Sequence, residues 1–263
     1  MKNFFKIAPW MTILIYLGVI LTLISAKSKE ILCTQIKVDI QDETSNYFIE
    51  ETDVLNMLND RGEQLIGLPI EQINVNKLEE FLLLNPSVKN ANVYRTYNGD
   101  VQISVTQRNP ILRVINKSRE SFYVDEEGSV MPLSNKYTAH VLVVSGDIDL
   151  SFTQLTSINQ SHDNEEIVEN SKRQLLDLYN LASYIYKNEF WRAQIEQIYI
   201  HGNEYELVPR VGTHVILLGD ISDYEIKLKK LKALYQQGLP IVGWNKYDKI
   251  NLKYFNQVIC TKR

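Results

Sequence analysis

At 263 residues, the chain is long enough for a membrane segment and one or two compact domains. Its composition, 44% hydrophobic and 23% charged with only 11 Gly and 7 Pro, excludes a disordered, collagen-like or disulfide-built protein. The formal net charge of the whole chain is −4. Residues 1–26 contain Lys2 and Lys6 and no acid, so residues 27–263 contain 26 basic and 32 acidic side chains and have a net charge of −6. Nucleic acid is not expected as a partner, since its binding depends on Lys and Arg against phosphate.

The first feature along the chain is an uncharged run over residues 7–26. Its 20 residues reach about 30 Å as a helix, which is the thickness of the hydrocarbon layer of a membrane. We therefore predict a single transmembrane helix at 7–26, after a short tail of residues 1–6. A cleaved signal peptide is the alternative, but Ile24 is too bulky for the small residue required two positions before a cut after Ala26.

Composition leaves the orientation of this helix open. Two lysines before the run are balanced by Lys27 and Lys29 after it, and large domains cross membranes largely regardless of their charge. The cysteines, Cys33 and Cys260, neither require nor exclude an oxidising compartment.

The sequence after Cys33 predicts a small α+β domain in the order strand, helix, helix, strand, strand. Strands are expected where polar and apolar residues alternate, and helices where apolar residues recur at helical spacing. The expected strands are 35–40, 88–95 and 100–105, and the expected helices are 52–58 and 74–85. Asn98-Gly99 is the strongest short signal for a hairpin turn. The expected core consists of Leu55, Leu58, Leu78, Leu82, Val93 and Ile103.

A second, mixed β domain with two helices is expected from Arg108 onward. Its strands are expected at 111–115, 121–124, 140–144, 195–200, 205–208 and 214–218, with a final alternating strand within 249–260. The first helix is expected at 171–190. The second is expected to begin at Ser222, in a capping box with Glu225, and to end at Gly238. Its charged face is interpreted as solvent-exposed: Glu225, Lys227, Lys229, Lys230 and Lys232.

The sequence lacks the short motifs of common enzymes. It contains no glycine-rich phosphate loop, no G-x-S-x-G, no H-E-x-x-H and no C-x-x-C. The four histidines show no spacing typical of metal ligands: His140, His162, His201 and His214. The acids of Asp125-Glu126-Glu127 are typical of a turn between strands. We therefore expect no catalytic, cofactor or metal site and no enzymatic activity.

Several other motifs occur in a fixed order along the chain. The first group is Asn85-Pro86-Ser87-Val88, Ala91, Val93, Arg95, Val101, Ile103, Val105, Gln107-Arg108 and Pro110. The later ones are Phe122-Tyr123-Val124-Asp125 with Gly128, Val215–Gly219, Lys230-Leu231 and Ile250–Tyr254. Together they resemble the FtsQ/DivIB family of bacterial cell-division proteins, in which a POTRA (polypeptide-transport-associated) domain precedes a β domain. The resemblance covers nearly the whole chain.

The sequence departs from the family pattern at three places. Gln107 replaces the usual Glu, Asn98-Gly99-Asp100 replaces an aromatic-Pro turn, and Asn251 replaces an Asp. These differences bear on individual contacts more than on architecture.

The resemblance implies a protein that crosses the cytoplasmic (inner) membrane once, with its N-terminus in the cytoplasm. The POTRA domain would occupy residues 33–107 and the β domain residues 108–263, both outside the cytoplasmic membrane. Such proteins are non-enzymatic scaffolds of the divisome at the division septum. They bind the small membrane proteins FtsB and FtsL and help control septal peptidoglycan synthesis, and other divisome proteins are expected to bind through the POTRA domain.

The partner-binding edge of the family maps onto the end of the chain. The residues concerned are Tyr254, Phe255, Asn256, Gln257, Val258, Ile259 and Cys260. They alternate as a strand does, and a free strand edge can receive a partner strand through main-chain hydrogen bonds. Alternation places Val258 and Cys260 on one face and Ile259 on the other, but leaves open which face is inward. A merely stabilising terminal strand is the alternative.

Two other classes of protein remain open. A POTRA-bearing envelope chaperone or secretion component would bind unfolded chains, and it predicts tandem POTRA units or a following β-barrel. A membrane-anchored envelope enzyme would require a nucleophile and a base, for which the sequence offers no candidates.

Overall fold

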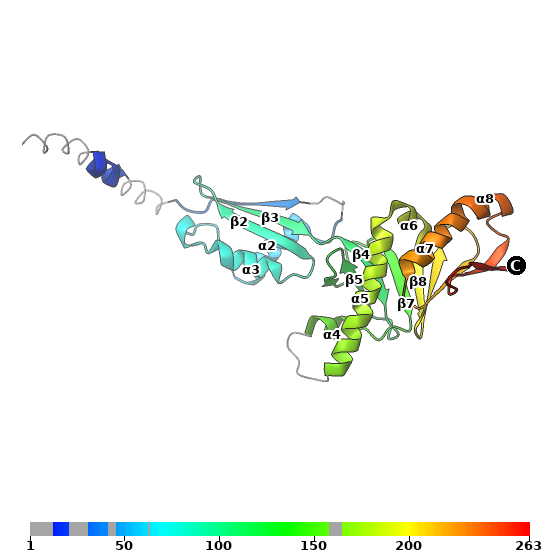
Figure 1. Cartoon of the computed structure of the whole chain (residues 1–263). Helices are drawn as coiled ribbons and strands as arrows, with labels where there is room; N and C mark the ends of the chain where they lie inside the picture. The colour runs from blue at the N-terminus through cyan, green and yellow to red at the C-terminus, as the bar shows by residue number, and fades with distance from the viewer. Residues whose placement is uncertain (1–12, 21–30, 42–45, 63, 158–164) are drawn as a thin grey trace, which may run out of the picture. The chain divides into compact units, whose positions relative to one another are not determined.

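The computed structural model describes residues 13–20, 31–41, 46–62, 64–157 and 165–263 (Figure 1). The chain divides into two compact units, Met1–Gln107 and Arg108–Arg263. Residues 13–20 form a helix with exposed apolar side chains. The rest of the predicted transmembrane segment, and the tail of residues 1–6, lie outside the described residues. No helix within the described part of the chain is long and apolar enough to span a membrane.

The first unit has the predicted order strand, helix, helix, strand, strand. Its elements are β1 (Gln35–Gln41), α2 (Glu51–Asp60), the 3-10 turn η1 (Ile70–Gln72), α3 (Val75–Leu83), β2 (Val88–Arg95) and β3 (Asp100–Gln107). The sheet has the order β1-β3-β2, with β1 parallel and β2 antiparallel to the central β3. This arrangement is a small α+β domain.

One helix start and one hairpin turn in this unit each depend on a single residue, Asn74 and Gly99 respectively. Asn74 caps α3, because its side-chain oxygen accepts a hydrogen bond from the backbone N–H of Lys77 at 3.1 Å. Gly99 adopts φ 90° in the turn between β2 and β3, where a Cβ would lie 2.5 Å from the carbonyl oxygen of Leu32. Only glycine fits this position without strain.

The core of the first unit contains five of the six predicted residues: Leu58, Leu78, Leu82, Val93 and Ile103. Leu55 is only half-buried, so its prediction as a core residue is wrong. The inward face of α2 is formed by Val54 and Leu58, which are four residues apart. Leu55 is rotated by about 100° from Val54 along the helix and therefore lies at the margin of the core.

Gln107, at the end of β3, ties the segment before α2 to the sheet. Its side-chain oxygen accepts hydrogen bonds from the backbone N–H groups of Phe48 and Ile49, both at 2.9 Å. Its side-chain nitrogen donates to the carbonyl of Asn46 at 3.1 Å. The side chain is buried. An amide can both accept and donate, whereas an ionised carboxylate only accepts, so Gln satisfies all three main-chain partners and an ionised Glu would satisfy two.

The second unit is built on a nine-stranded sheet of order β12-β11-β10-β9-β8-β7-β4-β5-β6. Its first elements are β4 (Pro110–Ile115), β5 (Ser121–Asp125), β6 (Val130–Met131), β7 (Leu142–Gly146), α4 (Phe152–Ser157), α5 (Glu165–Lys187) and α6 (Glu189–Gln194). The later ones are β8 (Ile195–His201), β9 (Glu204–Pro209), β10 (Val215–Gly219), α7 (Tyr224–Ala233), the π-helical segment η2 (Leu234–Gly238), α8 (Leu239–Val242), β11 (Tyr247–Asn251) and β12 (Ile259–Lys262). The pairs β4–β7, β7–β8 and β10–β11 are parallel and the others antiparallel.

One hydrophobic core joins the helices of this unit to the sheet. The inward side of α5 contributes Leu178, Leu181, Ala182 and Ile185 to this core, while Leu175 is only partly buried. The first predicted helix is interrupted at Asn188, which caps the separate helix α6 through a hydrogen bond from Trp191 N at 3.3 Å. With α4, α6 and α8, the unit contains more helices than the two predicted.

The prediction for the second helix was wrong at both ends. Ser222 does not cap it, since its hydroxyl donates to Asp220 and the residue before the helix is Asp223, at φ 52°. The helical path continues beyond Gly238 through α8 to Gly243, whose φ of 97° ends it. Lys227 is buried and pairs with Asp220 at 2.7 Å, so it does not belong to the solvent-exposed face.

Candidate partner-binding edge

The end of the chain forms an antiparallel pair of strands at one edge of the nine-stranded sheet. Ile250 faces Cys260 and Asn251 faces Ile259 across β11 and β12. On its other side, β11 is parallel to β10. Among the described residues, β12 is the terminal strand of the sheet and its outer edge pairs with no other strand.

The prediction of a continuous strand reaching from Tyr254 to Cys260 was wrong. The strand occupies Ile259–Lys262, and the chain reverses direction through the preceding residues, with a turn at 254–256. The reversal is required because β11 runs parallel to β10 whereas β12 runs antiparallel to β11. Asn256 and Gln257 are therefore exposed residues of the connection.

Three contacts hold this connection in place. Leu252 is fully buried, and its N–H donates to the carbonyl of Leu217 at 2.9 Å. The side chain of Asn251 accepts a hydrogen bond from the N–H of Lys253 at 3.0 Å, which starts the turn. Lys253 in turn pairs with Glu204. An asparagine at 251 thus serves the turn, although the family pattern has Asp there.

A lysine of α7 fixes the exposed end of the connection. The ammonium group of Lys230 donates to the main-chain carbonyls of Tyr254 at 2.7 Å and Phe255 at 3.1 Å. The sequence prediction had placed Lys230 on a merely solvated face. Its helical spacing gave no sign of this contact, because the contact depends on where the chain returns in three dimensions.

The structure identifies the inward and outward faces of the terminal strand. Val258 and Cys260 are partly buried and pack against the core. Ile259 points outward and is 40% exposed, and Phe255 is 73% exposed in the turn. Thr261 and Lys262, which the prediction omitted, continue the strand. The edge therefore presents an apolar side chain beside main-chain groups that pair with no other strand in the described part of the chain.

The edge is also basic. Residues 246–263 contain Lys246, Lys249, Lys253, Lys262 and Arg263, against the single acid Asp248. Opposite charges steer association and favour partners of complementary potential.

The one thiol of this edge is weakly reactive. Burial raises the pKa of the Cys260 thiol, which keeps it protonated and weakly nucleophilic at neutral pH. No group of three or more His, Cys, Asp or Glu side chains is placed to hold a metal ion in the described part of the chain.

Comparison with known families gives two matches. A family model described as FtsQ/DivIB, C-terminal related, matches residues 109–261, which include β11 and all of β12 except Lys262. A model of the POTRA-like domain matches residues 31–106. No curated protein matches the chain.

Proposed function

The chain belongs to the FtsQ/DivIB C-terminal related family, and from this membership we propose that it is a non-enzymatic scaffold of the bacterial division machinery. In this proposal it binds FtsB- and FtsL-like membrane proteins at the septum and helps control septal peptidoglycan synthesis. Residues 7–26 hold it in the cytoplasmic membrane with the N-terminus inside, and the POTRA-like unit receives other divisome proteins.

The free outer edge of β12 is the observation that carries this proposal. Its main-chain groups are available to an added strand, and its inner edge is already fixed by β11. Strand addition draws affinity from main-chain hydrogen bonds and specificity from alternate side chains. Ile259 and Phe255 are the apolar side chains that a partner would cover.

The basic character of the edge supports a partner segment that carries acidic side chains. Complex formation should then weaken as ionic strength rises, because salt screens exposed charges over about 8–10 Å. A purely apolar contact would show no such dependence.

Localisation through the cell cycle tests the proposed role. A fluorescent fusion to the full chain should concentrate at mid-cell in dividing cells. Depletion of the FtsB-like partner should leave the protein in the membrane without a functional septum. A uniform envelope signal at all stages would contradict the scaffold role and favour an envelope chaperone or secretion component.

A further inference from the structure

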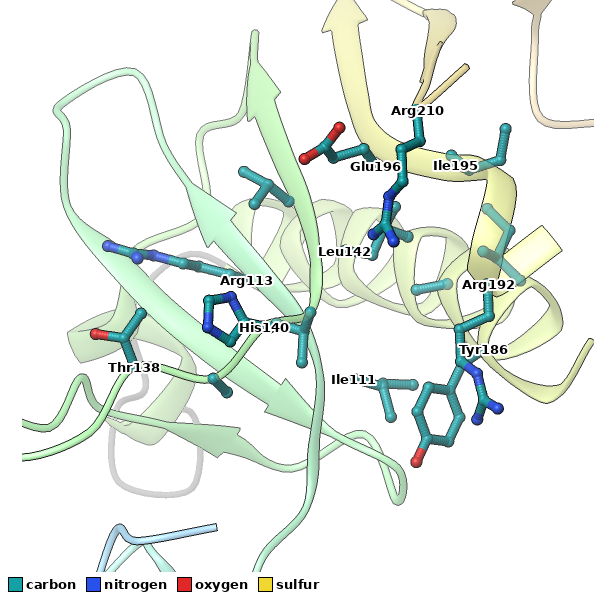
Figure 2. Close-up of a pocket in the computed structure, with 15 residues that line it drawn as sticks. Ile111, Arg113, Thr138, His140, Leu142, Tyr186, Arg192, Ile195, Glu196 and Arg210 are labelled. Carbon is teal, nitrogen blue, oxygen red and sulfur yellow. The ribbon is translucent and has the colours of Figure 1, made fainter. Parts of the chain in front are cut away.

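A cleft of about 320 Å³ opens in the second unit where the parallel strands β4, β7 and β8 begin (Figure 2). Leu112 of β4 pairs with Leu142, the first residue of β7, and Val143 pairs with Gln197 of β8. Both β4 and β8 therefore extend past the start of β7, so the sheet has a gap at this end. The predicted strand at 140–144 missed this gap, because His140 and Val141 precede β7.

The floor of the cleft is apolar and its rim is cationic. Ile111, Ile185 and Ile195 lie at the bottom, each nearly fully buried. Three arginines line the cleft, Arg113 from β4, Arg192 from α6 and Arg210 after β9. We call this site the arginine cleft. Its volume is at the lower end of the range for pockets that bind small ligands or single side chains.

Two of the arginines are held by the protein itself. Arg113 donates through Nε to the hydroxyl of Ser121 at 2.9 Å, and its guanidinium lies 5.9 Å from the centre of the Tyr123 ring. Arg192 lies 5.6 Å from the centre of the Tyr186 ring. These contacts restrict the side chains in advance, which lowers the entropy lost when an anion binds.

The positive charge of the cleft is not neutralised from within. None of the three guanidinium groups forms an ion pair with a described residue, and Glu196 is the one acid among the residues that line the cleft. This concentration of charge stands out in a chain whose net charge is −4. Guanidinium groups bind carboxylates through paired hydrogen bonds.

We propose that the arginine cleft is a second binding site, which receives an acidic peptide segment of another protein. Carboxylates of the segment pair with Arg192 and Arg210, and an apolar side chain next to them covers the partly exposed Val141 and Leu142 above the apolar floor. The apolar floor distinguishes this occupant from a phosphate group, which would use only the rim. The site is separate from the terminal edge, because β9, β10 and β11 lie between β8 and β12 in the sheet.

Binding of a defined peptide to the full chain in detergent tests this proposal. The probe is a fluorescein-labelled peptide of alternating glutamate and leucine, and its glutamine–leucine counterpart is the uncharged control. Fluorescence anisotropy should show binding of the first peptide only. Arg192→Gln and Arg210→Gln should each weaken it about tenfold, as expected for loss of a charge-assisted pair. Glu196→Gln should strengthen it, since a repelling carboxylate is removed.

Three controls make the result decisive. Lys172→Gln removes one exposed positive charge outside the cleft and should leave the affinity unchanged. Ile259→Asp should also retain the peptide, since the terminal edge is not involved. Circular dichroism verifies that the arginine variants fold. Equal binding by wild type and the arginine variants, or loss in Ile259→Asp, overturns the proposal. Displacement by inorganic phosphate or phosphatidylglycerol vesicles would show a phosphate site instead.

Discussion

The ammonium group of Lys230 lies 2.7 Å from the main-chain carbonyl oxygen of Tyr254 and also donates to that of Phe255. One side chain of α7 thus fixes the turn that leads into the terminal strand. The turn and β12 together form the edge that we assign to partner binding, so the position of Lys230 links the helix to the proposed interaction.

Lys230→Ala should weaken binding of the FtsB-like partner without a matching loss of thermal stability. The two lost hydrogen bonds order the turn before the partner binds. A net contribution of about 0.5–1.5 kcal/mol corresponds to an affinity lower by about two- to thirteenfold. Surface plasmon resonance with purified partner measures this. Lys229→Ala, at an exposed position of the same helix, is the matched control, and equal affinities for the two variants would refute the role of Lys230.

Substitutions at Val258, just before β12, and at Ile259, its first residue, should have different effects. Val258→Asp places a charge on the side that packs against the core, so the variant should unfold earlier, by roughly 1–3 kcal/mol. Ile259→Asp places the charge outside and should fold normally but bind its partner about 2 kcal/mol more weakly, if Ile259 is a hot spot. Thermal melting and co-purification measure the two effects. If both variants fold and keep the partner, the binding surface lies elsewhere.

Gln107→Glu should destabilise the first unit at neutral pH by about 1–3 kcal/mol. A carboxylate still accepts from Phe48 and Ile49, but it has no donor for the buried carbonyl of Asn46. Urea denaturation gives the change in unfolding free energy. Gln41→Glu, at an exposed end of β1, is the control for the added charge. Unchanged stability of Gln107→Glu would mean that the loop before α2 rearranges.

Leu82→Ala should cost on the order of 2–5 kcal/mol, the usual range for a buried leucine. The side chain is fully buried between α3 and the sheet, whereas Leu84, two residues later, is 66% exposed. Leu84→Ala should therefore change the free energy of unfolding by less than about 0.5 kcal/mol. Similar losses in both variants would show that the assigned inward face of α3 is wrong.

The stability of the second unit should fall in acid because of His214. Its Nε2 lies 2.7 Å from the hydroxyl of Tyr235, and burial lowers its pKa. Because the folded-state pKa is lower, the unfolded chain binds a proton at His214 more readily than the folded chain does. The contribution of neutral His214 to the free energy of unfolding is therefore complete above about pH 6.5, and it is lost as the pH falls through the lowered folded-state pKa. His214→Gln should show a shallower loss of denaturant midpoint between pH 7.5 and 5.

The first unit could be predicted almost completely from sequence, because local signals there agree with one another. Asn74 caps the helix that it precedes, and Asn98-Gly99 forms the turn between the two strands of the hairpin. In β2 and β3, the alternation of apolar and polar residues coincides with the alternation of buried and exposed side chains. The error at Leu55 was small, since a helix face is wide and its margin is ambiguous.

The second unit and the candidate edge were harder to predict, because several of their features depend on distant contacts. The alternation from Lys249 to Cys260 conceals a reversal that is fixed by Lys230, a residue distant in sequence. Lys227 is buried only because Asp220 lies beside it. The cleft depends on where β7 starts relative to β4 and β8. Spacing within a segment contains no information about such relationships.

The rate at which a reagent modifies the inward thiol of Cys260 can report on opening of the terminal strand. The side chain lies partly buried on the core side of β12 with a raised pKa, so a thiol reagent modifies it slowly, and faster when the strand detaches from β11. A change in the modification rate then reports a change in strand opening, in the manner of hydrogen exchange. Cys33, fully buried in the first unit, is an internal reference in the same molecule. A partner that adds a strand outside β12 would slow the reaction at Cys260 alone.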